Sequence, residues 1–153
     1  SYVYLRFKND PWPPAGVPRP ELLVPLVLLG LLLATSAPIW LASRSATPKR
    51  WLLAALALQA AYFALEVRQF DGDLSTFTPQ QSSYGSLYYT LLGADHAHVA
   101  IGLLLDVWIL GKLLGGLTPY RRRALRAIAV YWYAVDVLTF VVTLTVLSPS
   151  FVR

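Results

Sequence analysis

The sequence predicts an all-α protein, a polytopic bundle of four transmembrane helices built as a single membrane domain over residues 1–153. Of the 153 residues, 56% are apolar and only 14% are charged, whereas soluble domains carry about 25% charged residues. Four apolar stretches reach the length of roughly 20 residues that a helix needs to cross a bilayer. The links between them are short and contain the turn-favouring residues Pro48, Gly72, Pro79 and Pro119.

The predicted spans follow the four apolar stretches in order along the chain. They cover residues 22–43, 51–70, 86–114 and 124–147. The first contains no charged residue, and each of the others contains at least one ionisable residue. A charged group inside a membrane span is costly and is by default a candidate for function.

The links differ in charge, and this difference predicts the orientation. The first link carries Arg44, Lys49 and Arg50 without an acid, and the third carries five basic residues between positions 112 and 126. The second carries Asp71 and Asp73. Because Lys and Arg concentrate in cytoplasmic loops, we expect the first and third links inside, and both termini on the outer, periplasmic side. The net charge of +5 then reflects topology, and we expect no nucleic-acid partner.

The segment before the first span has a different composition. Residues 7–21 are rich in proline, which cannot sit in a helix interior, so we expect an outer loop with Trp12 at the level of the lipid headgroups. Residues 1–6 resemble the end of an apolar helix, and the chain contains no methionine. We therefore expect that Ser1 is not the natural start and that an earlier part is missing.

The third span carries the largest group of polar residues. On a helix, Asp95, His98, Gly102 and Asp106 fall within about 80° of one another. Such a stripe faces protein or water rather than lipid. It is either a proton path or ligand site, or a buried network in which Asp95 and His98 bond each other or a neighbouring helix; the network is the favoured interpretation.

Two further acids lie in the other spans. Glu66, near the outer end of the second span, is either a proton-coupled carboxylate, as in a small antiporter, or an acid that reaches toward the interface. Asp136 lies about halfway along the fourth span beside Tyr131, Trp132 and Tyr133. We expect it to make a hydrogen bond between helices.

The sequence offers little for catalysis or cofactor binding. The chain has no cysteine, and His96 and His98 point about 200° apart on a helix, so they cannot share one metal. Bis-histidine haem needs ligands from facing helices, and the other spans contain no histidine. We expect no catalytic residue, no metal and no redox cofactor in this chain.

Three motifs resemble, in the same order, those of cytochrome c oxidase subunit III. Residues 12–17 (W-P-P-A-G-V) are similar to the family's W-P-P-x-G-I/V loop. Residues 84–102 are similar to Y-G-S-x-F-F-x-x-T-G-F-H-G-x-H-V-x-x-G, and residues 131–137 to part of W-Y-W-H-F-V-D-V-V-W. The chain departs from the pattern at Ala94-Asp95, where the family has Phe-His, and at Tyr133-Ala134, where it has His-Phe.

The resemblance implies an accessory, non-redox subunit III of a bacterial haem-copper terminal oxidase, the inner-membrane oxidoreductase complex that passes electrons from cytochrome c to oxygen. This multi-pass chain would match the family's last four helices. Haem and copper would lie in partner subunits I and II. The chain would bind phospholipid, support proton uptake and stabilise the catalytic subunit. These residues do not distinguish an oxidase subunit from an accessory subunit of a nitric oxide reductase, which belongs to the same superfamily.

Two sets of candidate site residues follow. The first is an intramembrane polar network of Glu66, Asp95, His98, Asp106 and Asp136. The second is a lipid headgroup site on the third link, formed by Arg121, Arg122, Arg123 and Arg126. The alternative function is a small four-helix proton-coupled transporter that uses Glu66, Asp95 and Asp136.

Overall fold

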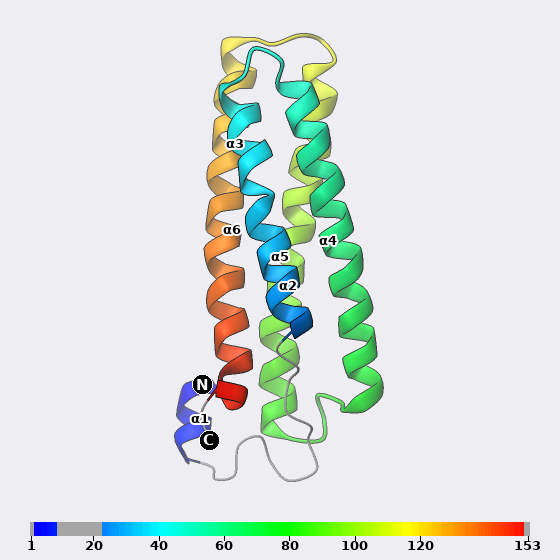
Figure 1. The fold of residues 1–153 in the computed structure, drawn as a ribbon, viewed down its shortest axis with the longest axis vertical. Coiled ribbons are helices and arrows are strands. Elements are labelled where there is room, and N and C mark those ends of the chain that lie inside the picture. The colour runs from blue at the N-terminus through cyan, green and yellow to red at the C-terminus, as the bar shows by residue number, and fades with distance from the viewer. Residues whose placement is uncertain (1, 9–22, 152–153) are drawn as a thin grey trace.

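The computed structural model describes residues 2–8 and 23–151, and within these ranges the chain is helical and contains no strand. Four segments are long and apolar enough to cross a membrane, and they run up and down beside one another (Figure 1). The predicted all-α, four-span fold is therefore confirmed. The predicted proline-rich loop lies outside the described residues, except for Phe7 and Lys8, which are helical.

The helices of the second and fourth spans extend beyond the predicted bounds at both ends, and that of the third span begins earlier than predicted. Their bounds are α1 Tyr2–Lys8, α2 Leu23–Ala34, α3 Ser36–Arg44, α4 Pro48–Thr76, α5 Ser83–Leu113 and α6 Pro119–Phe151. Hydropathy detects only the part of a helix that matches the hydrocarbon core, whereas the polar turns at its ends continue into the interface. Pro48 and Pro119, expected in the links, are the first residues of α4 and α6. Proline fits there because the first N–H of a helix has no partner within the helix.

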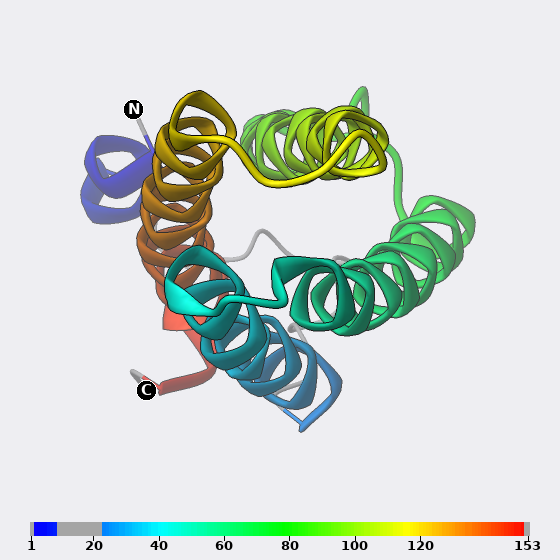
Figure 2. The ribbon, with the colours of Figure 1, turned by 90° about the horizontal axis from the view of Figure 1, so that it is seen from above.

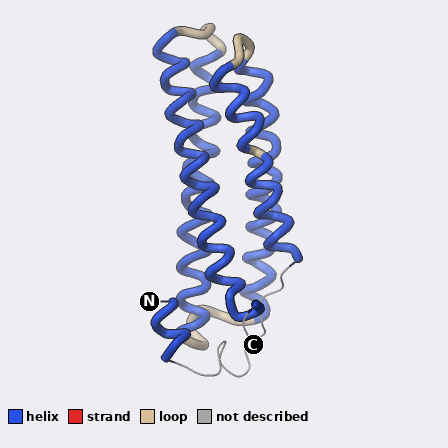
Figure 3. Tube along the Cα trace, turned by 60° about the vertical axis from the view of Figure 1, so that its left-hand side comes forward, coloured by secondary structure: helices blue, strands red, loops and turns tan. Residues whose placement is uncertain are grey.

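The first span, predicted as one helix over residues 22–43, is interrupted at Thr35 (Figure 3). Pro38 lies in the first turn of α3 and has no N–H to donate to the carbonyl of Ala34. At the break, the Thr35 hydroxyl donates to the carbonyl of Leu32 at 2.6 Å. Ser36, whose hydroxyl donates to Asp136, is the first residue after this break.

Seen from above, the four long segments form a ring in which each packs against its neighbours in the chain, and α3 closes the ring against α6 (Figure 2). The links 45–47 and 114–118 meet at one end of the bundle, here called the basic end. Link 77–82 lies at the opposite end, here called the acidic end because Asp71 and Asp73 precede it.

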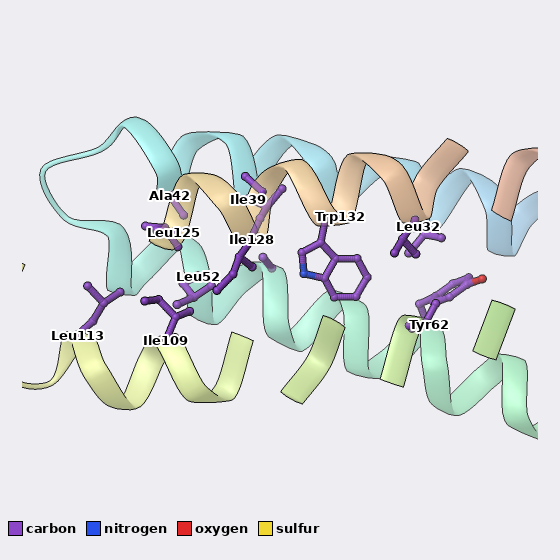
Figure 4. Close-up of a cluster of buried hydrophobic side chains, with 14 of the residues drawn as sticks. Leu32, Ile39, Ala42, Leu52, Tyr62, Ile109, Leu113, Leu125, Ile128 and Trp132 are labelled. Atoms are coloured by element: carbon purple, nitrogen blue, oxygen red, sulfur yellow. The ribbon is translucent and has the colours of Figure 1, made fainter. Parts of the chain in front are cut away.

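The core consists of two clusters along the bundle axis. The larger is aliphatic and surrounds Trp132 and Tyr62 (Figure 4). The smaller is aromatic, lies toward the acidic end and contains Phe77, Tyr84, Tyr88 and Tyr89. Large apolar side chains also cover the outside of the bundle. Leu104, for example, is 70% exposed. An outer surface of this kind suits contact with lipid rather than water.

Candidate functional site

Three aspartates of the third and fourth membrane spans lie inside the bundle. Asp95, Asp106 and Asp136 have exposed fractions of 1%, 0% and 5%. Each accepts a hydrogen bond from an uncharged donor on a different helix. A buried polar group without a partner would cost several kcal/mol in an apolar setting. These bonds therefore offset part of the cost of burying the aspartates, although Oδ1 of Asp136 has no partner in the protein, and at the same time they join helices.

Asp106 is held by the fourth span. The indole Nε1–H of Trp132 donates to Oδ1 and Oδ2 of Asp106 at 3.0 and 3.1 Å. The indole fits because Gly102, one turn before Asp106, has no side chain. A Cβ on Gly102 would lie only 2.6 Å from the Trp132 ring. Gly102 and Asp106 on α5 and Trp132 on α6 therefore pack together and join the two helices.

Asp95 also bonds to α6, where the Thr139 hydroxyl donates to its Oδ1 at 2.7 Å. His98, predicted to share the polar stripe, is exposed. Its Nδ1–H donates to the carbonyl of Ala94 in its own helix at 2.6 Å. The structure therefore brings Asp95, Gly102 and Asp106 to the α5–α6 interface and leaves the His98 ring outside it.

Asp136 faces the broken first span, and the Ser36 hydroxyl at the start of α3 donates to its Oδ2. This contact links residues that are 100 positions apart in the chain. The expected hydrogen bond between helices is present at Asp136. Its partner, Ser36, carries no charge and stands in no recognisable motif, so the sequence offered no signal for it.

Glu66 lies beside an internal cavity in the half of the bundle nearer the acidic end. The cavity offers about 40 Å³ to the centres of water-sized molecules, more than the roughly 10–15 Å³ that one water requires. Its lining includes Tyr62, Glu66 and His96. Glu66 Oε2 lies 3.7 Å from His96 Nε2. Since the Leu92 carbonyl, 2.5 Å from His96 Nδ1, can only accept, Nδ1 carries a proton and Nε2 is the atom that faces Glu66.

A row of polar groups on α4 continues from this pair toward the basic end. Gln59, Tyr62 and Glu66 follow one another at helical spacing on the inner face of α4. The Tyr62 hydroxyl and both amide atoms of Gln59 are buried without a hydrogen-bond partner in the protein. Buried groups of this kind are commonly satisfied by internal water. The spacing of Gln59, Tyr62 and Glu66 was visible in the sequence, but the inner face of α4 was not.

The described residues contain no group of three or more His, Cys, Asp or Glu side chains that could hold a metal ion. His96 faces the cavity and His98 the outside. As expected from their spacing, the two imidazoles point in different directions. The polar core can therefore accept and donate hydrogen bonds, and at Glu66 and His96 it can hold a proton.

The four arginines of the predicted lipid site occupy different surroundings. Arg121 donates to the carbonyl of Gly116 at 2.6 Å. Arg122 donates to the carbonyls of Ser43 and Ser45 at 3.5 and 3.0 Å, where α3 ends. Arg123 is exposed. Arg126 lines a groove between α3 and α6. All four arginines, predicted on the third link, lie in the first turns of α6, and they are divided between contacts with backbone carbonyls and open surface.

Together these features define a class, a membrane-embedded helical bundle whose spans are joined by buried carboxylates and their neutral donors. Comparison with known proteins assigns the chain within that class. The profile described as Cytochrome c oxidase subunit III matches residues 8–148. The chain belongs to the cytochrome c oxidase subunit III family, as its three motifs predicted.

Individual relatives agree with this assignment. The chain is 28% identical over 132 residues to the cytochrome bo(3) ubiquinol oxidase subunit 3 of Pseudomonas aeruginosa, covering 81% of this chain and 63% of that protein. It is 31% identical over 133 residues to the cytochrome c oxidase subunit 3 of the hagfish Myxine glutinosa, covering 82% and 51%. It is 32% identical over 90 residues to the cytochrome c oxidase subunit 3 of Bacillus subtilis, covering 57% of this chain and 44% of that protein. The chain thus spans about half the length of the curated relatives it matches.

Proposed function

We propose that the chain is an accessory, non-redox part of a haem-copper terminal oxidase in a bacterial inner membrane. Family membership supports this proposal, and the relatives are named as subunits of cytochrome c and ubiquinol oxidases. In such a complex, haem and copper would reside in partner subunits I and II. Electrons would reach oxygen there, while this chain would stabilise the catalytic subunit and support its proton uptake.

One observation carries the accessory role. The three buried aspartates are each bonded to an uncharged donor on another helix. Carboxylates arranged in this way hold a bundle together, because each bond joins two spans. Among the described residues, the Glu66–His96 pair at the cavity is the place where a carboxylate and an imidazole could exchange a proton.

The alternative of a small proton-coupled transporter has no support from the comparisons. It would use Glu66, Asp95 and Asp136 along one path. Glu66 lines the cavity, whereas Asp95 and Asp136 do not and are bonded at helix interfaces instead. This distribution favours a supporting subunit over a transport path.

The orientation and the lipid contacts belong to the same proposal. The basic end would face the cytoplasm, since Lys and Arg concentrate on that side, and the acidic end would face the periplasm. Exposed apolar side chains around the bundle would contact acyl chains. Phospholipid headgroups would meet the basic end.

Affinity purification from native membranes in a mild detergent tests this function. With a tag on this chain, we expect haem absorption in the visible spectrum and stoichiometric recovery of two larger subunits. A tag on an unrelated multi-pass protein from the same membrane is the control. Recovery of the chain without any haem protein would contradict the proposal. Oxygen and nitric oxide consumption by the purified complex would distinguish an oxidase from a nitric oxide reductase.

A further inference from the structure

A groove opens at the basic end between α3 and α6, away from the internal cavity. It has a volume of about 630 Å³. From α3 it is lined by Trp40 and Arg44, and from α6 by Arg126, Val130 and Tyr133. None of the described residues that line it is acidic. The groove therefore combines two guanidinium groups with an apolar floor.

The two arginines differ from their neighbours in how they are used. Arg121 and Arg122 bond to backbone carbonyls of the links. Arg44 instead lies over the ring of Trp40, with its guanidinium carbon 4.8 Å from the ring centroid. Stacking on an aromatic face orients a guanidinium and leaves its N–H edge available for an anion. Arg126 reaches the same groove from the facing helix.

The other residues that line the groove indicate what kind of molecule would fit beside the two arginines. Trp40 and Val130 are 45% and 64% exposed and extend the groove along the apolar surface of the bundle. Tyr133 lines the same groove from α6. The chemistry that fits is an anionic head at the interface attached to an apolar chain.

We propose that this groove binds one anionic phospholipid. Its phosphate would lie between Arg44 and Arg126, and an acyl chain would run over Trp40 and Val130. A basic pocket between transmembrane helices on the cytoplasmic side is a common arrangement for lipid headgroups. The inference rests on the proposed function only in placing the basic end at a membrane surface. It replaces the four arginines of the predicted lipid site, all on α6, with a pair from two helices, of which Arg126 alone was predicted.

The test measures lipid retention in the assembly that contains this chain, purified in mild detergent. In the R44Q/R126Q double variant we expect about one anionic phospholipid fewer per complex, by quantitative mass spectrometry of extracted lipid. The matched control is K49Q/R123Q, which removes two exposed basic residues from the same end of the bundle. Equal lipid content in the two double variants would overturn the proposal.

Two further measurements keep the result interpretable. After delipidation, added phosphatidylglycerol should bind the control variant and not R44Q/R126Q, whereas phosphatidylcholine should bind neither tightly. Equal binding of both lipids would show that charge does not select the occupant and would overturn the proposal of an anionic lipid.

A photoreactive benzophenone on Val130→Cys, in a chain that otherwise lacks cysteine, should crosslink to lipid. A crosslink to protein would identify the groove as a protein interface and overturn the lipid assignment. Lipid is counted on whatever assembly contains the chain, so these outcomes are independent of whether haem co-purifies.

Discussion

Trp132 on α6 donates its single N–H to both carboxylate oxygens of Asp106 on α5, and both side chains are fully buried. An acid and an aromatic residue that lie 26 positions apart thus form one contact in the middle of the bundle. Neither residue has an obvious role on its own. Together they connect the two longest helices.

Removing this donor should destabilise the bundle. In Trp132→Phe, Asp106 would stay buried without its donor, and we expect a loss of about 1–3 kcal/mol. Thermal unfolding of the purified complex measures it. Trp108→Phe is the control, since Trp108 is 46% exposed on α5. The double variant D106L/W132F should be more stable than W132F alone, and a double variant less stable than W132F would contradict this account.

The glycine beneath the indole gives a second prediction. Gly102→Ala should cost about 1–3 kcal/mol, because the added methyl group overpacks a buried interface. The indole has little freedom to move away, since its N–H is bonded to Asp106. Gly111→Ala on the same helix is the control, as a Cβ there meets nothing within 4 Å. Equal assembly yields and unfolding temperatures for the two variants would refute the proposed close packing.

Threonines on α6 allow a matched comparison at Asp95. Thr139→Val keeps the shape of the side chain and removes the donor to Asp95, so we expect a loss of about 1–3 kcal/mol. Thr145→Val removes a hydroxyl that bonds only within its own helix, at 2.8 Å to the Val141 carbonyl, and should have little effect. Unfolding of the two variants in the same detergent checks the difference. The contact would be dispensable if T139V unfolded like the wild type.

At the internal cavity, Glu66 and His96 should be energetically coupled. A double-mutant cycle with Glu66→Gln and His96→Gln should give a coupling free energy of about 1 kcal/mol, because the two side chains face each other at 3.7 Å. Denaturation midpoints of the four proteins provide the cycle. Asp71→Asn in place of Glu66→Gln is the control, since Asp71 is exposed. Strict additivity of the two single changes would show that the pair does not interact.

The basic end offers a prediction about helix termination. Arg122→Gln removes donors to the carbonyls of Ser43 and Ser45 at the end of α3, and we expect a loss of about 1 kcal/mol. Faster amide exchange at the residues that follow α3 would report the loosening locally. Arg123→Gln, one residue further along, is exposed and should leave exchange unchanged. Equal exchange in both variants would mean that Arg122 does not hold this end.

The sequence by itself determined the four spans, the family and the positions of the intramembrane acids. Long apolar runs are a local property, and a charge inside such a run is visible without a structure. The break at Thr35 was not anticipated, although Pro38 was in view. A proline fits the first turn of a helix but disrupts the interior of one. The apolar run from Leu22 to Ser43 did not indicate whether Pro38 lies in the interior of one helix or in the first turn of a second.

Only the tertiary structure decided the partners of those acids. Ser36, Trp132 and Thr139 are uncharged residues from distant parts of the chain, and each meets an aspartate only after the helices have packed with a particular rotation. The same rotation left His98 outside and turned His96 toward Glu66. Helical spacing shows which residues share a face, but the neighbour of that face is set by packing between helices. For the same reason the sequence showed only a run of arginines, whereas the structure shows that Arg126 and Arg44, from two helices, line the same groove.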